Sequence, residues 1–261
     1  MRTILIVALS LCAVTTCAVA ANGSGDTFGG GGGPMPTLVF LQLEDLNGAL
    51  TRAGYPQVDQ VLFATGGGGY WGALDGIRIG GFGVGGDNVS ELESRSASFD
   101  MEYGGMMVEK AVQAEENFTV VLGTMLGAGN LNLRLIDGLP LTFDEAVSHP
   151  FISSITKEFY AVQLYAAFEF KPSSRMWARF QLGFLWTLAG DWSFEETEFA
   201  GPPHRLGGLT ASLMIRFGGG EGIPREDLET ALEELSRELE ALNEADLDSD
   251  QAMEPTEAET E

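Results

Sequence analysis

The clearest pattern in the sequence is a strict alternation of apolar and other side chains between residues 159 and 188. Over 159–171 one parity is filled by Tyr160, Val162, Leu164, Ala166, Phe168 and Phe170. Over 176–188 one parity is filled by Met176, Ala178, Phe180, Leu182, Phe184, Trp186 and Leu188. A period of two sustained over about a dozen residues predicts β-strands and not helices. The polar turn at 171–174 joins them, so an antiparallel hairpin is predicted.

Three further segments carry a similar signal. Apolar and polar residues alternate over 98–108 and 209–217, and 117–135 is strand-like with an expected break at Gly127–Gly129. The connections are expected to be short at 66–69, 109–116 and 171–174, and long at 85–95, 137–156 and 190–204. This alternation predicts an all-β fold, an antiparallel up-and-down meander of about eight strands closed into a barrel. The β domain is predicted to cover 57–217.

The stretch GIRIGGFGVGGD at 76–87 has the glycine spacing of a dinucleotide-binding loop. Gly81, Gly83 and Gly86 occupy the three positions of G-x-G-x-x-G. Such a loop needs a following helix whose N-terminus faces the phosphates. The segment after Asp87 is short and polar, without an amphipathic stripe, so no cofactor site is predicted there.

The same stretch changes its apolar parity at a glycine pair. Ile77 and Ile79 lie on one parity, whereas Phe82 and Val84 lie on the other. A change of phase beside glycine is typical of a β-bulge or a bend in a strand. The pattern therefore predicts a β-bulge or a bend at Gly80–Gly81, where glycine lets the strand curve.

The chain begins with three segments of different composition. Residues 1–20 combine a positive charge, an apolar run and an A-x-A end, which predicts a cleaved signal peptide and export. Residues 21–36 contain five consecutive glycines and are predicted to be a flexible linker. Residues 37–56 are predicted to hold a short helix that covers one end of the β domain, because leucines recur at helical spacing from Leu43 to Leu50.

Residues 218–261 are predicted to form an acidic helix and a disordered tail. From 221 onward there are 16 acidic and 2 basic residues, which gives −14 of the total charge of −24. This charge excludes nucleic acid as a partner, because binding phosphates requires clustered Lys and Arg. A run of low hydrophobicity and high charge is expected to stay solvated.

An amphipathic helix is predicted at the start of this tail. Its apolar stripe consists of Leu228, Leu232, Leu235, Leu239 and Leu242. The spacing is heptad-like but extends over few heptads. The stripe either packs on the β domain or mediates self-association, and the sequence leaves both open.

Acidic residues beyond this helix have the spacing of a calcium loop of the EF-hand type. They are Asp246, Asp248, Asp250, Glu254 and Glu257. Gln251 stands where the loop needs glycine, and Pro255 interrupts the segment. A solvated acidic tail is therefore the main interpretation, and weak calcium binding is the alternative.

The two faces of the predicted strands differ in chemistry. One face is rich in Phe, Leu and Trp, and the other carries charges that can pair inside a barrel, Glu169 with Arg179 or Arg216. Apolar residues outside and paired charges in the lumen are typical of a membrane-spanning barrel. The aromatic residues expected in its interfacial girdles are Trp177, Trp186, Trp192, Phe159 and Tyr160. A soluble sheet with a second covering layer is the alternative.

The last predicted strand, LTASLMIRF at 209–217, resembles the final strand of small bacterial outer-membrane β-barrel proteins. Phe217 takes the place of the terminal aromatic residue, and Leu213 and Ile215 precede it at alternate positions. The resemblance implies an outer-membrane location with lipid as partner, although the chain continues beyond Phe217. The glycine-rich stretch GGGGYWGALDGIRIGGFGVGG more loosely resembles uncharacterised secreted bacterial proteins, which implies no activity.

No residue set with catalytic spacing is found in the sequence. His149 and His204 stand beside prolines in expected loops, and Cys12 and Cys17 both lie within the predicted signal peptide. We therefore expect no enzyme, no cofactor and no catalytic residues. The expected function is that of a cell-envelope protein with a structural, adhesive or small-pore role. The alternative is a soluble periplasmic or secreted β-protein that binds an apolar ligand or a protein partner.

Overall fold

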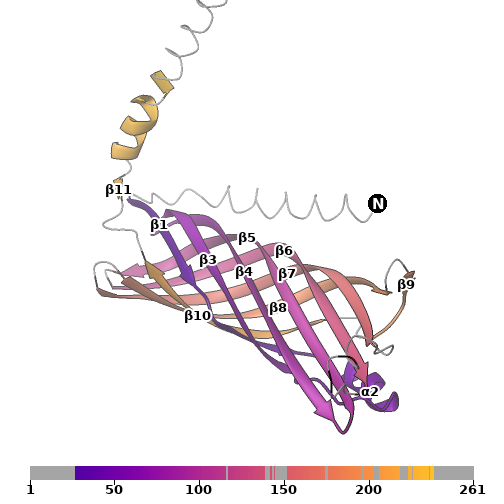
Figure 1. Cartoon of the computed structure of the whole chain (residues 1–261). Helices are drawn as coiled ribbons and strands as arrows, with labels where there is room; N and C mark the ends of the chain where they lie inside the picture. The colour runs from indigo at the N-terminus through magenta and orange to yellow at the C-terminus, as the bar shows by residue number, and fades with distance from the viewer. Residues whose placement is uncertain are drawn as a thin grey trace, which may run out of the picture.

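The protein is an all-β antiparallel meander in one sheet (Figure 1). The computed structural model describes residues 27–115, 117–138, 142, 144, 152–173, 176–194, 197–202, 206–217, 223–224, 226–234 and 236–237. In chain order the elements are β1 (Thr27–Pro34), β2 (Thr37–Leu41), α2 (Glu44–Arg52), β3 (Val61–Ala73), β4 (Ile77–Leu92), β5 (Arg95–Glu115), β6 (Phe118–Asp137), β7 (Ile152–Ser173), β8 (Met176–Phe194), β9 (Thr197–Phe199), β10 (Gly207–Phe217) and β11 (Ile223–Pro224).

Eight strands pair in a closed ring, which we call the eight-stranded ring. Strands β2 to β8 each pair with the next one, β8 pairs with β10, and β10 pairs with β2. β1 precedes β2 and pairs with the other half of β3, while β9 and β11 are short additions to β8 and β1. The predicted all-β antiparallel meander is confirmed. Its last ring strand, β10, ends at Phe217 as expected.

The register of the ring determines how far its strands tilt. Starting from Trp71 on β3, the paired residues in successive strands are Ile79, Val108, Thr124, Leu164, Phe184, Leu209 and Phe40. Phe40 pairs with Val61, so one circuit returns to β3 ten residues before its start. With strands about 4.8 Å apart and a rise of about 3.4 Å per residue, this offset over the ring corresponds to a tilt of about 40°. Closed antiparallel sheets of this size have such tilts.

The half of the ring interior next to α2 is an apolar core. Its most buried side chains include Val39, Leu62, Phe99, Met101, Leu131, Leu133, Phe159 and Leu185. Helix α2 lies at this end of the ring (Figure 1) and buries Leu43, Leu46 and Leu50 in the same core. The side chain of Asn47 holds the helix in place, because it accepts from Val58 N and donates to Val58 O, both at 2.9 Å. The sequence analysis expected polar side chains to face inward along the strands. This half of the interior is apolar instead, and the buried charged side chains lie in the other half.

The segment 21–36, expected to be a flexible linker, contains a strand instead. Its glycines from Gly29 to Gly33 pair residue by residue with β3 as part of β1. A Cβ on Gly33 would lie within 1.9 Å of the Ile215 carbonyl oxygen. Glycine is therefore required here by the close approach of neighbouring backbones, and not by flexibility.

The predicted helix is present as α2, but the limits of the helical segment 37–56 and of several connections were wrong. Residues 37–41 of the expected helical segment form strand β2, so the ring includes residues before the predicted 57–217. The expected turn at 66–69 lies within β3, and β6 continues through Gly127–Gly129 without a break. Runs of glycine resemble turns in a sequence, but here they lie within continuous strands.

The β-bulge predicted at Gly80–Gly81 does not occur. The pairing of β4 with β3 and with β5 is continuous through both residues. Arg78 and Phe82 both face the interior, while Ile79 faces outward. The apolar parity changes because β4 passes from the charged half of the interior into the apolar half, and the backbone keeps its phase.

Candidate functional site

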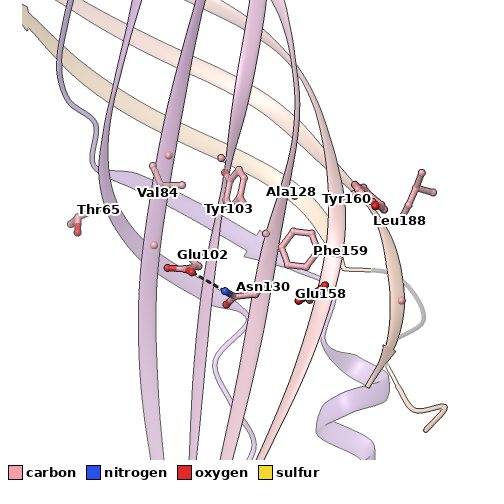
Figure 2. A pocket seen from close by; sticks show the side chains of 15 residues that line it. Thr65, Val84, Glu102, Tyr103, Ala128, Asn130, Glu158, Phe159, Tyr160 and Leu188 are labelled. Atoms are coloured by element: carbon pink, nitrogen blue, oxygen red, sulfur yellow. Dashed lines mark hydrogen bonds between the residues drawn. The ribbon is translucent and has the colours of Figure 1, made fainter. Parts of the chain in front are cut away.

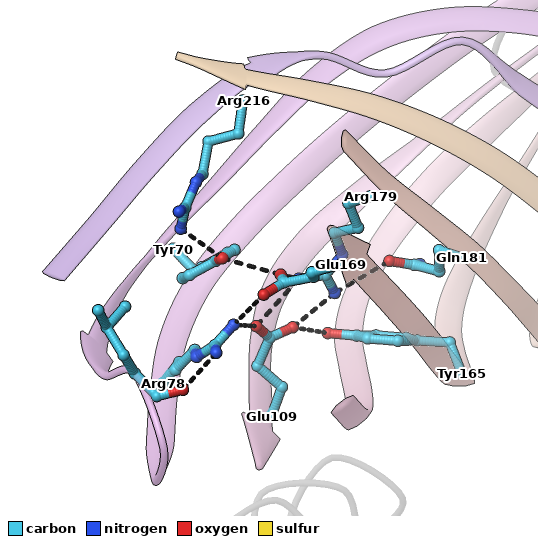
Figure 3. Close-up of polar contacts among 9 residues, drawn as sticks. Tyr70, Arg78, Glu109, Tyr165, Glu169, Arg179, Gln181 and Arg216 are labelled. Carbon is cyan, nitrogen blue, oxygen red and sulfur yellow. Dashed lines mark hydrogen bonds and ion pairs between the residues drawn. The ribbon is translucent and has the colours of Figure 1, made fainter. Parts of the chain in front are cut away.

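The half of the interior away from α2 holds a group of buried polar side chains, the charge cluster (Figure 3). Its members are Tyr70, Arg78, Glu109, Tyr165, Glu169, Arg179, Gln181 and Arg216. The five charged members are only 1–3% exposed. They come from β4, β5, β7, β8 and β10, so the cluster spans the ring and includes three positive and two negative groups.

Arg179 bridges both carboxylates of the cluster. Its Nη1 donates to Oε1 of Glu109 and to Oε1 of Glu169, each at 3.0 Å, and its Nη2 donates to Oε2 of Glu109 at 2.6 Å. Tyr165 also donates to Oε2 of Glu109, at 3.1 Å. A buried ion pair is tolerated when its partners satisfy each other in this way.

Glu169 is held by a second arginine and by a phenol. Arg78 Nη1 donates to Oε2 of Glu169 at 2.8 Å, and Tyr70 donates to Oε1 at 2.8 Å. Arg78 Nη1 also lies 3.6 Å from Oε1 of Glu109. Both carboxylates are thus neutralised by more than one donor, which leaves neither as an unengaged acid or base.

Arg216 enters the cluster through Tyr70. Its Nη1 donates to the Tyr70 hydroxyl, and its guanidinium carbon lies 5.1 Å from the Tyr70 ring and 4.7 Å from the Trp177 ring. Arg78 and Arg179 also lie within cation–π distance of the Tyr70 ring, at 4.7 and 5.4 Å. Tyr70 therefore shares its ring among three guanidinium groups.

Part of the outer surface of the eight-stranded ring is apolar. In this part each ring strand presents large apolar side chains outward, and we call it the outer apolar belt. Representatives, one from each strand, are Phe40, Phe63, Ile79, Met106, Leu122, Leu164, Leu182 and Leu209, which are 43–68% exposed. Isolated exposed apolar residues are ordinary, but a continuous apolar surface marks an interaction with lipid or protein.

The height of the outer apolar belt follows from β7 and from the strand tilt. Its outward positions from Tyr160 to Phe170 are apolar without interruption. This length of strand is about 34 Å, which is about 26 Å along the ring axis at the tilt derived above. The apolar band of a transmembrane barrel is about 25 Å tall.

The outer surface becomes polar beyond this belt, on the side of α2. Glu102, Asn130 and Glu158 pair in one cross-strand row. Asp100, Asn132 and Thr156 form the next row towards α2. The outside of the ring therefore has an apolar zone and a polar zone, and the polar zone lies at the end with α2.

The structure brings two of the three predicted charge-pair residues into contact. Glu169 and Arg179 are directly opposite each other on β7 and β8, with Oε1 and Nη1 3.0 Å apart. Arg216 bonds to Tyr70 and not to Glu169. The sequence analysis missed Arg78 and Glu109, although each stands on the interior parity of its strand.

The predicted aromatic girdle is divided between the two faces. Trp186 and Tyr160 face outward, 47% and 55% exposed. Trp192 and Phe159 instead face the interior and are buried. Trp177 lies half-buried at the charge cluster. Trp192 lies on the opposite parity to the interior residues of β8, and it faces inward because the β7–β8 register shifts between Lys157 and Phe159. Phe159 has the same parity as the interior residues Ala161 and Gln163.

Most of the predicted tail sites lie outside the described residues. These are the calcium candidates Asp246, Asp248, Asp250, Glu254 and Glu257 and the leucines Leu235, Leu239 and Leu242. His149 and His204, which precede the tail, also lie outside the described residues. The described part of the tail includes a helix over 226–234, in which Leu232 is 54% exposed. Self-association and calcium binding therefore stay predictions.

None of the helices in the described part of the chain has the length and apolar character to cross a membrane. The described residues contain no group of three or more His, Cys, Asp or Glu placed to hold a metal ion.

The solved structures to which the chain is similar include two crystal structures of Ail. The crystal structure of Ail, the attachment invasion locus protein of Yersinia pestis, in complex with the heparin analogue sucrose octasulfate is 12% identical, with a TM-score of 0.42, and the match covers 73% of this chain and 97% of that chain. A second crystal structure of Ail is 11% identical, with a TM-score of 0.38, and the match covers 74% and 99%. No family model and no curated protein matches the sequence.

Proposed function

We propose that the chain is an exported, non-enzymatic protein of the bacterial cell envelope that spans the outer membrane as a small β-barrel. The observation that carries this proposal is the outer apolar belt, which surrounds the ring and has the height of a membrane's hydrocarbon layer. A second layer of protein, which a soluble sheet needs over its apolar face, is absent from the outside of the ring in the described residues.

The direction of insertion follows from the connections. The end with the charge cluster has short turns between β3 and β4, β5 and β6, and β7 and β8. The end with α2 has the polar outer rows and three longer connections, between β2 and β3, β6 and β7, and β8 and β10, beside a short turn between β4 and β5. In outer-membrane barrels short turns face the periplasm and long loops face outward. We place α2 and the polar rows outside the cell, and the acidic segment after Phe217 in the periplasm.

The filled interior favours a structural or adhesive role over a pore. The charge cluster closes one half of the ring, and the apolar core with α2 closes the other. Small barrels have interiors just wide enough for side chains to fill. The polar outer rows and α2 are then the parts that an external partner meets.

Membrane fractionation tests the proposed function. The full chain, expressed in a Gram-negative host, is expected in the outer-membrane fraction and is expected to resist extraction with alkaline carbonate or urea. Recovery in the soluble periplasm would contradict the proposal and favour a soluble β-protein with an apolar ligand or partner.

A further inference from the structure

The charge cluster carries one positive charge in excess. Its three arginines, Arg78, Arg179 and Arg216, face two carboxylates, those of Glu109 and Glu169. All five side chains are nearly inaccessible to solvent. Burying a charge without a counter-charge is strongly unfavourable. The described cluster therefore needs one further negative group to be neutral.

The excess charge belongs to Arg216. Arg78 and Arg179 each lie within ion-pair distance of both carboxylates. Arg216 lies at the edge of the cluster and is connected to it only through the Tyr70 hydroxyl (Figure 3). Tyr70 donates its own proton to Glu169, so it is a neutral phenol. No Asp or Glu in the described part of the chain forms an ion pair with Arg216.

One edge of the Arg216 guanidinium has no acceptor. Nη1 donates to Tyr70, whereas Nε is buried without a hydrogen-bond partner, and Nη2 forms no hydrogen bond with any described residue. Nε and Nη2 lie on the same edge of the planar group, and this edge matches two oxygens of a carboxylate or a phosphate. The Nε atoms of Arg78 and Arg179 are also unpaired, but the Nη atoms of both already hold carboxylates.

The strands on either side of Arg216 supply no negative charge. On one side β10 pairs with β1, which consists only of glycine from Gly29 to Gly33. On the other side Arg216 is directly opposite Trp177 of β8. The missing negative group therefore does not come from the neighbouring wall.

A second cation lies beside Arg216, at the end of the ring away from α2. The Arg216 guanidinium carbon lies 4.7 Å from the centre of the Trp177 ring, and the Nζ atom of Lys171 lies 5.8 Å from the centre of the same ring. Lys171 forms no ion pair with a described Asp or Glu. Lys171 and Trp177 are both half-buried, so a ligand from solvent can reach them.

A hollow of about 920 Å³ on the outer face of the ring has the opposite charge (Figure 2). Glu102 and Glu158 line it, and its described lining contains no Lys or Arg. Such a lining repels anions. The features that attract an anion are thus found at Arg216 and Lys171 and not in the outer hollow.

We propose that Arg216 and Lys171 bind a phosphate group at this end of the ring. Two of its oxygens accept from Nε and Nη2 of Arg216, and a third faces Nζ of Lys171. Two cations suit a phosphate better than a single carboxylate or chloride, since a phosphate carries more charge and more acceptor oxygens. The group is either inorganic phosphate or the phosphate of a phospholipid, which present the same oxygens. That this end faces the periplasm rests on the proposed function, whereas the excess charge does not.

Isothermal titration calorimetry of the full chain in an uncharged detergent tests this proposal. Sodium phosphate is the titrant, and sodium chloride keeps the ionic strength constant. The wild type is expected to bind one phosphate per chain, and its unfolding temperature is expected to rise with phosphate but not with chloride. R216M is expected to lose both effects, and K171M is expected to bind phosphate several-fold more weakly.

Matched controls remove cations from the outer face of the ring. R134M on β6 and K110M on β5 each replace an exposed side chain, and both are expected to bind phosphate as the wild type does. If R216M does not fold, the comparison of K171M with K110M decides. Equal affinities in these two variants would contradict a role of Lys171 and overturn the site.

Dihexanoyl phosphatidic acid, titrated in the same way, identifies the source of the phosphate. An affinity several-fold above that of inorganic phosphate, lost in R216M, assigns a phospholipid, and an equal affinity assigns the free ion.

Two outcomes would overturn the phosphate site. The first is a folded wild type that shows no saturable phosphate binding or is stabilised equally by chloride. The second is binding that appears only in E221Q, because the first acidic side chain after Phe217 would then be the partner of Arg216. A wild type that does not enter bilayers contradicts the proposed function and leaves the result of the titration in detergent unchanged.

Discussion

Arg179 on β8 and Glu109 on β5 bond across the interior of the eight-stranded ring, with Nη2 and Oε2 only 2.6 Å apart. The two residues are 70 positions apart in the chain, and their strands are not neighbours in the ring. The bond therefore connects opposite parts of the wall. It closes the space through which a solute would otherwise pass.

The variant R179M is expected to lower the free energy of unfolding by about 3–5 kcal/mol, because it leaves two carboxylates buried without their shared partner. Urea unfolding in detergent micelles, followed by tryptophan fluorescence, measures the change. The control is R237M, which removes the exposed arginine that lies 3.5 Å from Glu233. Such a pair contributes less than about 0.5 kcal/mol, and equal losses in the two variants would argue against a stabilising charge cluster.

Substitution by alanine is expected to change the stability strongly at one glycine of β4 and only slightly at another. G80A should lower the stability by about 3 kcal/mol, since the added Cβ would overlap the backbone of β3. G83A should change it by less than about 1 kcal/mol, since the added Cβ would lie no closer than 3.9 Å to a neighbouring atom, the Tyr103 carbonyl oxygen. The same unfolding measurement compares them. If G83A proves as destabilising as G80A, then Gly83 is a packing residue and the space beside it is not open.

The alternation of side chains made the strands and their two faces predictable from the sequence. The hairpin of β7 and β8 follows from that period and the polar turn, and the contact of Glu169 with Arg179 is one of the two pairings that the sequence left open. Arg78 and Glu109 are directly opposite each other on the neighbouring strands β4 and β5. They were not assigned to the interior because the sequence analysis expected a change of phase at Gly80–Gly81 and a connection at 109–116. The glycine runs led to wrongly predicted turns. The sequence does not show whether a glycine is needed for a turn or for the close approach of a neighbouring strand.

The position of α2 is expected to depend on Arg95. Its Nη1 donates to the carbonyl oxygens of Ala53 and Gly54 at 3.3 and 3.1 Å, directly after the helix, and its Nε lies 2.9 Å from Oδ1 of Asp137. In R95A the amides of α2 should exchange with deuterium faster, while those of β3 keep their wild-type rates. R134A is a control on the outer face of β6. Unchanged exchange in α2 would show that its buried leucines hold it without Arg95.

The filled interior leads to a prediction about conductance. The wild type, reconstituted in a planar bilayer, is expected to show no stable unitary conductance steps, because buried side chains occupy both halves of the ring. A porin of known conductance in the same bilayer is the positive control. Reproducible steps in the wild type would assign the chain a pore function in place of a structural or adhesive one.

The contact of the outer apolar belt with lipid is tested most directly by fluorescence quenching at single cysteines. Both native cysteines precede residue 18, so L164C on the outer face, Q163C in the interior and D100C in the polar zone each introduce one thiol into the described chain. With a small fluorophore attached and nitroxide-labelled lipids in the bilayer, L164C is predicted to be strongly quenched and D100C weakly. Q163C should either resist labelling or show weak quenching. Weak lipid quenching at L164C together with strong quenching by aqueous iodide would contradict the membrane-spanning account.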